Sequence, residues 1–366
     1  MHRSFLVLLA GFAATSVLCA AAASGRVAWA DINKQPAAWY ATADARALAD
    51  SIVQYQTDSG GWPKNRDMTQ PPDAEFLANT AMDHRAATID NDATIIQLRY
   101  LGRVIAATDA TRYGAAFRKG FDYLLAAQYA NGGWPQYFPL QEGYYTHITF
   151  NDNAMINVME VLRDAAGGKD PFAFVDAARR EKARAAVDRG IACILRCQVT
   201  LDGVKTVWCA QHDEKTFAPA KARAYEHPSL SGSESVGIVR FLMAIDRPGP
   251  DVVAAVTGAA AWFEKTRLTG FRYEVVDAPE IPGGRDRRVI PDPQAGPLWA
   301  RFYEIGTNRP IFSGRDSVMR YAVSEIEPER RNGYSWYGAW PRQLLEKDYP
   351  AWRVKWLPAQ IGRAHV

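Results

Sequence analysis

The strongest constraint on the fold is a repeated unit in which a helix-like stretch ends at a glutamine and a glycine turn follows. The glutamines are Gln56, Gln128 and Gln198, so they lie 72 and then 70 residues apart. Each one ends a stretch with apolar residues at helical spacing, at 43–56, 115–128 and 185–198. This spacing leaves room for two helices and their connections in each unit. The sequence therefore predicts a fold built from helical hairpins.

A second helix is predicted in each unit. These partner helices lie at 93–103, 154–166 and 235–245. Alternating helices that are joined by long irregular loops favour a mainly α fold, an α/α barrel or toroid with short irregular β-strands and long loops. In such a fold we expect the loops at one end of the helices, and not the helices themselves, to build the functional site.

The composition changes after Pro248. One more helix, at 252–266, precedes a segment rich in proline and aromatic residues that indicates short strands and ordered loops, with one strand at 271–276. No linker is long enough to separate independent domains. We therefore expect residues 31–366 to form a single domain with a loop-rich C-terminal part, and we expect the protein to be a monomer.

Residues 1–30 have the pattern of a secretory signal peptide. A short basic start precedes an apolar run at 5–23, and an Ala-x-Ala cleavage site ends at Ala30. We expect a secreted or periplasmic protein with no stable membrane association after cleavage. The alternative is a retained anchor, because the apolar run is nearly long enough to span a bilayer, although its many alanines make it only weakly hydrophobic.

Charge and cysteine content exclude some partners and ligands. The net charge of +3 permits an acidic partner, and the absence of any Lys/Arg run argues against nucleic acid. Cys197 and Cys209 flank a Leu-Asp-Gly turn, so they either form a disulfide across a hairpin or stay as buried free thiols. No Cys or His pair stands at the spacing of zinc ligands.

Carboxylate and amide side chains recur at the start of two partner helices. The first motif is Asp90-Asn91-Asp92 and the second is Asn151-Asp152-Asn153, each followed by alanine. Such residues either cap a helix or supply oxygen ligands to a hard cation such as Ca²⁺. One motif alone favours capping, and the repetition makes a metal site competitive.

Three arginines lie close together in the loop-rich segment. Arg301, Arg309 and Arg315 are surrounded by aromatic residues and lie near proline and glycine. The planar guanidinium group suits carboxylate recognition, so an acidic ligand is one interpretation. The other is that these arginines pair at the surface with Glu304 and Asp316.

Tryptophans follow the glycine turns, and a polar loop precedes the third partner helix. Trp62 and Trp134 end Gly-Gly-Trp motifs, and Trp336 and Trp340 lie in a similar C-terminal motif. They are either platforms for sugar rings or core anchors at helix ends. In the polar loop at 219–235, the serines and glutamate at its end are candidates to cap the next helix, and we expect its histidine to be structural.

Taken together, these motifs resemble those of the family 10 pectate lyases. The resemblance extends over about 43–341 and rests on Gly-Gly-Trp-Pro-Lys-Asn, Thr-Ile-Asp-Asn, Phe-Asn-Asp-Asn-Ala-Met, Ala-Arg-Ala-Tyr-Glu-His-Pro-Ser, and Arg-Phe-Tyr-Glu followed by Arg-Pro-Ile-Phe-Ser-Gly-Arg-Asp. It implies an (α/α)₃ toroid with a groove for polygalacturonate and calcium-dependent β-elimination.

The resemblance also implies residue roles. Asp90 and Asp152, with Asn91, correspond to the metal site, and Arg315 corresponds to the catalytic arginine. The positions that correspond to substrate-binding groups are Arg223, Arg301 and Lys64, and we add Arg309 as a further carboxylate-binding arginine. Asp92 stands where the family more often has glycine, so it either adds a carboxylate to the metal site or faces solvent.

The implied chemistry agrees with these residue types. Ca²⁺ between the aspartates and a uronate carboxylate would stabilise the negative charge that develops when the C5 proton leaves. An arginine base must first lose its own charge, because its ordinary pKa lies above about 12. On physical grounds alone, Arg315 is a positioning or charge-stabilising group, and either role predicts that Arg315→Lys loses turnover.

Two other functions fit parts of the pattern. A glycoside hydrolase on the same fold would use Asp90 and Asp152 as its acid and base, but it leaves the arginines without a purpose unless the substrate is acidic. A non-catalytic protein that binds acidic polysaccharide would need the aromatic residues but not Arg315. Elimination yields an unsaturated product that absorbs in the near ultraviolet, whereas hydrolysis and binding do not.

Overall fold

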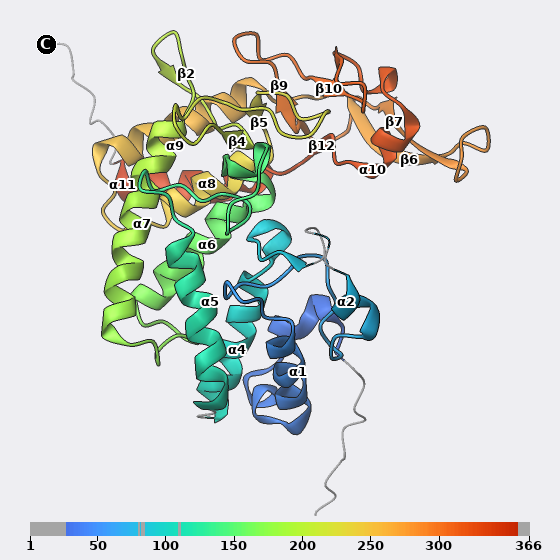
Figure 1. Ribbon diagram of the computed structural model, residues 1–366. Helices are drawn as coiled ribbons and strands as arrows, with labels where there is room; N and C mark the ends of the chain where they lie inside the picture. Colours follow the sequence, from blue (N-terminus) through green and yellow to red (C-terminus); the bar gives the residue numbers. More distant parts are fainter. Residues whose placement is uncertain (1–26, 80, 82–84, 109–110, 358–366) are drawn as a thin grey trace, which may run out of the picture.

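The computed structural model describes residues 27–79, 81, 85–108 and 111–357. Helices form an arc, and its two ends face each other across the open side (Figure 1). We call residues 27–108 the N-terminal arm and residues 266–340 the C-terminal arm. Most of the predicted signal peptide lies outside the described residues. Within them, no helix combines the length and the apolar character that crossing a membrane requires.

The helices form two layers. Their bounds are α1 Ala43–Gln54, α2 Ala74–Ala78, α4 Ile95–Thr108, α5 Gly114–Ala126, α6 Ala154–Ala166, α7 Ala177–Cys197, α8 Glu234–Met243, α9 Pro250–Lys265, α10 Pro328–Gly333 and α11 Tyr349–Trp356. One layer contains α4, α6 and α8, and the other contains α5, α7 and α9, with α1 packed on α4. The predicted helical toroid is confirmed, and over the described residues it is an open arc and not a closed barrel.

The strands are short and pair in twos. Their bounds are β1 Ile148–Thr149, β2 Thr200–Leu201, β3 Val204–Lys205, β4 Gln211–His212, β5 Leu230–Ser231, β6 Phe271–Asp277, β7 Arg285–Pro291, β8 Trp299–Ala300, β9 Phe302–Tyr303, β10 Phe312–Ser313, β11 Met319–Arg320 and β12 Tyr337–Gly338. The antiparallel pairs are β1–β4, β2–β3, β5–β9, β6–β7, β8–β12 and β10–β11. The predicted strand at 271–276 is confirmed as part of the long hairpin β6–β7, which belongs to the C-terminal arm.

The repeated glutamines have the same structural role in every unit. The amide nitrogen Nε2 of Gln56 donates to the carbonyl of Gly60 at 2.7 Å and to a carbonyl of α5 at 2.8 Å. Gln128 and Gln198 make the corresponding pairs of bonds to their own turns and to α7 and α9. Each glutamine therefore joins its turn to the next helix of the same layer, which explains why the residue recurs.

Core burial explains the tryptophans of the glycine turns. Trp62, Trp134 and Trp336 are fully buried. The indole nitrogens of Trp62 and Trp134 each donate at 2.8 Å to a carbonyl of the preceding helix. Trp208 makes the same contact in the third unit, at 2.7 Å, although its turn lacks the Gly-Gly-Trp motif. These tryptophans are core anchors and not sugar platforms.

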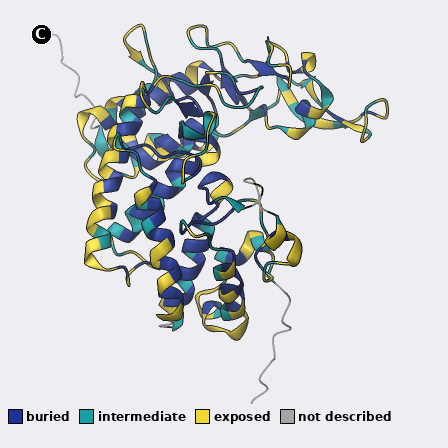
Figure 2. Cartoon of the chain, in the orientation of Figure 1, coloured by how far each residue is buried: buried dark blue, intermediate teal, exposed yellow. Residues whose placement is uncertain are grey.

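Buried residues line the facing sides of the helices, and exposed residues cover the outer sides (Figure 2). One large apolar cluster runs from Ile32 to Trp352 through the helical layers, and a smaller one lies around Phe312 and Trp336 in the C-terminal arm. Cys197 and Cys209 are buried free thiols, so no disulfide joins them.

Candidate active site

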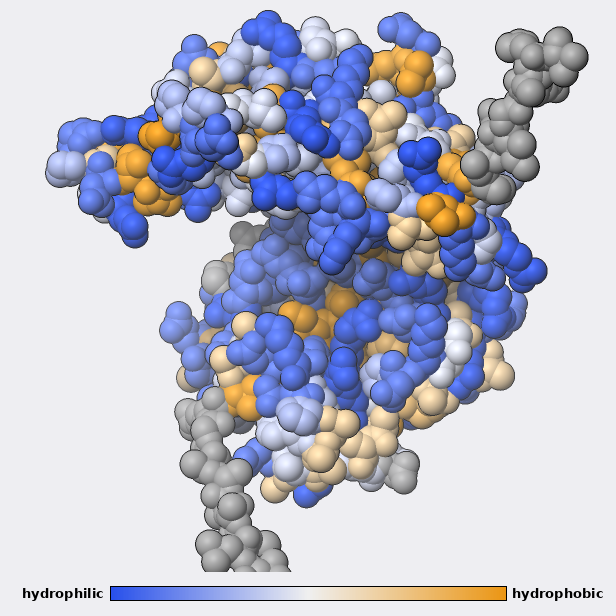
Figure 3. Space-filling view, turned by 180° about the vertical axis from the view of Figure 1, so that it is seen from behind, coloured by the Kyte–Doolittle hydropathy of each residue, from blue (hydrophilic) through white to orange (hydrophobic). Residues whose placement is uncertain are grey.

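The loops at one end of the helical units converge on a polar pocket of about 150 Å³. Lys64 and Gln136 line it from equivalent positions after the two Gly-Gly-Trp-Pro turns. The other lining residues are Asn65, Asp90, Asn91, Tyr144, Asn151, Asp152, Gln211, Arg223 and Glu226. From behind, the surface is hollowed between the two arms, and hydrophilic residues line much of the hollow (Figure 3).

Both acidic motifs have an unusual backbone. Asn91 and Asp92 have φ values of 50° and 59°, and Asp152 and Asn153 have φ values of 50° and 60°. Two consecutive left-handed residues are costly for any residue except glycine, although Asn and Asp tolerate the conformation best. Asn153 precedes α6 but its side chain makes no capping hydrogen bond. The second motif therefore does not cap the helix, and Asn151 and Asp152 line the pocket.

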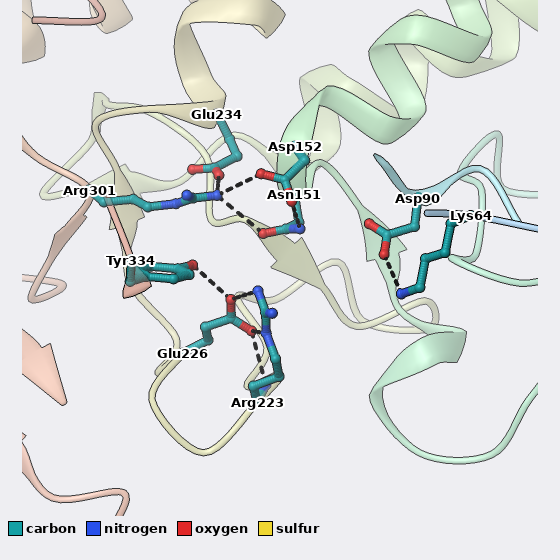
Figure 4. A network of polar contacts seen from close by, with 9 residues as sticks. All are labelled: Lys64, Asp90, Asn151, Asp152, Arg223, Glu226, Glu234, Arg301 and Tyr334. Carbon is teal, nitrogen blue, oxygen red and sulfur yellow. Dashed lines mark hydrogen bonds and ion pairs between the residues drawn. The ribbon is translucent and has the colours of Figure 1, made fainter. Parts of the chain in front are cut away.

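The carboxylate of Asp90, in the first motif, is paired with a lysine. Asp90 is buried, and its Oδ2 accepts a hydrogen bond from Lys64 Nζ at 2.7 Å (Figure 4). Burial lowers the pKa of Lys64. The negative charge of Asp90 and its hydrogen bond to Lys64 raise this pKa by more, so the net shift is upward. In this structure Lys64 is therefore a charged counterion of Asp90.

The carboxylate of Asp152, in the second motif, is paired with an arginine. Arg301 Nη2 donates to Asp152 Oδ1 at 3.0 Å and to Asn151 Oδ1 at 3.4 Å, and it also contacts Glu234 Oε1 (Figure 4). Arg301 follows β8, and its backbone N–H donates to the Trp336 carbonyl at 2.7 Å. Burial lowers the pKa of Arg301, but the charges of Glu234 and Asp152 raise it overall. Arg301 thus remains charged behind the pocket.

A second arginine faces the pocket directly. Arg223 Nε donates to Glu226 Oε2 at 2.8 Å, and Nη2 donates to Oε1 at 2.5 Å. The hydroxyl of Tyr334 donates to the same Oε1 at 2.8 Å, and its ring lies 4.7 Å from the guanidinium carbon of Arg301. Tyr334 therefore connects the two arginine–glutamate pairs, as Figure 4 shows.

The side chains of the first motif are divided between two pockets. Asn91 lines the polar pocket, and its Nδ2 donates to Asn65 Oδ1 at 2.9 Å. Asp92 lines a separate pocket next to Ile95 and accepts from Asn157 Nδ2 at 2.5 Å. Burial, followed by the charge of Asp152, raises the pKa of Asp92. The sequence left open whether Asp92 is a further ligand in the polar pocket. This geometry argues against that role, because Asp92 lines a different pocket.

The structure does not bring Arg315 or Arg309 into the pocket. Arg315 lies in the loop after β10, its side chain is 64% exposed, and it binds Glu329 at 2.9 Å. The guanidinium carbon of Arg309 lies 3.6 Å from the ring centroid of Tyr321, in a different surface depression. Of the arginines expected at the site, Arg223 lines the pocket and Arg301 lies behind it.

Sequence reasoning did not assign Glu226, Glu234 or Tyr334 to the site. Glu226 and Glu234 are 5% and 3% exposed. The signal for Glu234 was a carboxylate at the start of an otherwise apolar helix, which was interpreted as part of a cap. The capping serine was expected to be Ser233 or Ser235, but in the structure Ser231 accepts the backbone N–H of Glu234 at 3.0 Å. Buried carboxylates next to arginines were thus the missed component.

Among the residues that the structure describes, one further group of possible metal ligands lies outside this pocket. It consists of His147, Asp213 and Glu214. Asp213 Oδ1 already accepts the backbone N–H groups of Lys215 and Thr216, at 3.0 and 2.7 Å. This aspartate therefore closes a turn, and the polar pocket is the better candidate for an active site.

Comparison with known proteins identifies the family. The family model of pectic acid lyases matches residues 56–345. The chain belongs to the pectic acid lyase family. It is therefore a pectate lyase, an enzyme of polysaccharide degradation, and the resemblance of its motifs is confirmed. A comparison with curated proteins found no match.

Two solved structures are similar to this pectate lyase. The family 10 polysaccharide lyase from Cellvibrio cellulosa is 35% identical, over 88% of this chain and 94% of that chain, with a TM-score of 0.74. An aspartate-to-alanine mutant of the Cellvibrio cellulosa family 10 lyase, in complex with trigalacturonic acid, is 37% identical, over 87% of this chain and 98% of that chain, with a TM-score of 0.73.

Proposed function

We propose that this lyase cleaves polygalacturonate by calcium-dependent β-elimination in the polar pocket. The observation that carries the proposal is the convergence of Asp90, Asp152, Lys64 and Arg223 on that pocket from different helical units. Two carboxylates suit a divalent cation, and two cationic side chains suit the carboxylates of an acidic sugar. The trigalacturonic acid bound to the Cellvibrio mutant supports this substrate class.

The lining residues fit a calcium ion. Calcium prefers many oxygen ligands, and the pocket offers the carboxylates of Asp90 and Asp152 with the side-chain oxygen of Asn91. Two further oxygens, Oε1 of Gln136 and Oε1 of Gln211, are buried without a hydrogen-bond partner among the described residues. When bound, calcium supplies positive charge that stabilises the uronate carboxylate as it gains electron density. We therefore assign Asp90, Asp152 and Asn91 to the metal site.

We assign the proton transfer to Arg223 and not to Arg315. Arg223 lines the pocket, whereas Arg315 is exposed and paired with Glu329. Burial lowers the pKa of Arg223, but its hydrogen bonds to Glu226 and the charge of Glu226 raise it overall. Arg223 becomes a base only after it loses a proton, and Glu226 is the carboxylate in contact that can accept that proton.

The elimination removes one proton and breaks one C–O bond. Neutral Arg223 removes the C5 proton of a galacturonate unit, and the electron pair of the C5–H bond forms a C4=C5 double bond. The C4–O bond to the neighbouring sugar breaks, and its oxygen takes a proton from solvent. Lys64 orients a uronate carboxylate, and Arg301 adds positive charge from behind the pocket, which lowers the cost of the charge that develops.

The test is a polygalacturonate assay that follows near-ultraviolet absorbance with calcium and with EGTA. The proposal expects an absorbing product that depends on calcium and forms fastest at alkaline pH. New chain ends without absorbance would support the hydrolase alternative, and binding without cleavage would support the non-catalytic one. Asp90→Asn should abolish calcium-dependent activity, whereas the matched variant Asp92→Asn, which alters the same motif outside the pocket, should retain most of it.

We also propose that the lyase is exported. The structure packs Val27 and Trp29 against the large core cluster, next to the buried Ile32. Signal cleavage after Ala30 would remove those contacts, so we expect the cut to lie before Val27. The intact mass of the exported protein gives the position of the cleavage site. A mature chain that starts at Asp31 would contradict this prediction.

A further inference from the structure

Arg301 is shared between two carboxylates, and within the described part of the chain one nitrogen, Nη2, makes all of its side-chain hydrogen bonds. Nη2 has two hydrogens but three acceptors, which are Asp152, Asn151 and Glu234. Its Nε is buried without a partner among the described residues. The acceptors therefore compete for the same donor, and a change at one of them redistributes the hydrogen bonds of the others.

The two carboxylates differ in how firmly they are held. The side chain of Asp152 is 41% exposed, whereas that of Glu234 is 2% exposed. Glu234 starts α8, and its second oxygen, Oε2, accepts from the hydroxyl of Ser231. Glu234 is thus a fixed partner of Arg301, while Asp152 is free to turn toward a ligand in the pocket.

The approach of α8 to the second acidic motif is also fixed by packing. A Cβ atom on Gly237, in the first turns of α8, would lie 2.1 Å from Oδ1 of Asn153. No side chain larger than glycine fits there without displacing the motif. The distance between Glu234 and Asp152 is therefore set by the backbone and not by flexible side chains.

We propose that Glu234 is a positioning residue that keeps Arg301 neutralised while Asp152 passes from Arg301 to calcium. The inference rests on the proposed calcium site. Without Glu234, Asp152 is the one carboxylate among the described residues that contacts the buried Arg301. Calcium must then compete with an undivided ion pair. With Glu234 present, Arg301 keeps a charged partner after Asp152 leaves, and it stays next to the substrate pocket.

The Lys64–Asp90 pair provides the contrast within the same pocket. Lys64 contacts Asp90 at 2.7 Å and lies 5.5 Å from the ring centroid of Tyr137. Neither contact supplies a second carboxylate. When Asp90 binds calcium, Lys64 is therefore released toward the acidic substrate, whereas Arg301 is retained. The shared arginine is the feature that requires a dedicated counter-charge.

The test is calorimetric titration of calcium into substrate-free protein, because it does not depend on turnover. We expect Glu234→Gln to bind calcium about tenfold more weakly than the wild type. In an Arg301→Gln background, the same Glu234→Gln change should alter the dissociation constant by less than about twofold, because the competing cation is gone. An equal loss in both backgrounds, or no loss in either, would overturn the proposal.

A matched variant tests whether the effect is only through-space charge. Glu226→Gln removes another buried carboxylate of the pocket, but one that contacts Arg223 and not Arg301. We expect it to weaken calcium binding by less than about threefold. If Glu226→Gln and Glu234→Gln weaken binding equally, then Glu234 acts by its charge alone and the positioning role is wrong.

Folding and the calcium site itself are controlled separately. Thermal unfolding of each variant checks its fold, and the double variant Glu234→Gln/Arg301→Gln leaves neither member of this charge pair unpaired. The double variant should bind calcium at least as tightly as the wild type, and a tenfold loss there would overturn the proposal. Wild-type protein that binds no calcium would refute the calcium site, whereas normal binding by Glu234→Gln would refute only this inference.

Discussion

Replacing Arg223 with lysine is the most direct test of which arginine acts in the pocket. Two parallel hydrogen bonds, at 2.8 and 2.5 Å, join Arg223 to Glu226, whose side chain is 7% exposed. A lysine keeps the charge but cannot reproduce the planar two-point contact. The loss of one hydrogen bond to a buried charged group costs about 1.5–3 kcal/mol.

That free energy sets the expected size of the effect. About 1.4 kcal/mol corresponds to a factor of ten. The loss of about 1.5–3 kcal/mol should therefore lower kcat/KM of Arg223→Lys about 10- to 150-fold. The loss should fall mainly on kcat, since proton transfer and not ground-state binding depends on the orientation of Arg223. Arg315→Lys provides the comparison, because its ion pair with Glu329 is exposed and should matter less than about fivefold.

Initial rates of near-ultraviolet absorbance on polygalacturonate, at saturating calcium, give kcat and KM for both variants. Thermal unfolding of both confirms that they fold. If Arg315→Lys loses more turnover than Arg223→Lys, the pocket is not a reliable guide to the reacting arginine. The catalytic role would then return to Arg315, as the sequence motif predicts.

Three further predictions concern residues outside the reaction itself. Gln198→Leu removes bonds of 2.9 Å to the carbonyls of Thr206 and Ala255, so urea unfolding should show a loss of about 1–3 kcal/mol with kcat unchanged; an unchanged free energy of unfolding would contradict the repeat role of this glutamine. Asp286 has a pKa lowered by hydrogen bonds from Arg331, so it stabilises the fold above its ordinary pKa and this contribution is lost as the pH falls through the lowered value. The difference in Tm between wild type and Asp286→Asn should therefore shrink as the pH falls below about 4, the ordinary pKa of an aspartate, and a constant difference would refute the linkage. Arg309→Ala should change kcat/KM by less than about twofold, and a large rise in KM would restore its predicted role in substrate binding.

The helical architecture could be predicted because local signals repeat. The stretch at 154–166 was predicted as a helix and α6 has those bounds, and the other predicted helices differ mainly at their ends. Glutamine, glycine and tryptophan recur because the glutamine joins each turn to a neighbouring helix and the tryptophan binds a carbonyl of the preceding helix. Trp208 shows the limit of motif reading, since it has the same contact as Trp62 without the flanking glycines.

The site could be predicted only in part, because its members are far apart in sequence. Asp90 and Asp152 were recognised from the doubled motif, and the structure places both on the pocket. The partner of each carboxylate was not predictable, since Arg301 lies 149 residues from Asp152. Three arginines within fifteen residues suggested a cluster, but Arg315 and Arg309 project elsewhere, and it is Arg223 that lines the pocket.

The charges of the pocket explain why an acidic sugar would need a metal ion there. The ion pairs in and behind the pocket contain four carboxylates, Asp90, Asp152, Glu226 and Glu234, and three cations, Lys64, Arg223 and Arg301. One negative charge is in excess, so the ligand-free pocket does not attract a polyanion by charge alone. A divalent cation reverses the sign, and binding of calcium and of trigalacturonate must then strengthen each other by the same factor. Calcium titrations of Arg223→Lys with and without the trimer measure that factor, and equal affinities would show that the anion does not sense the metal.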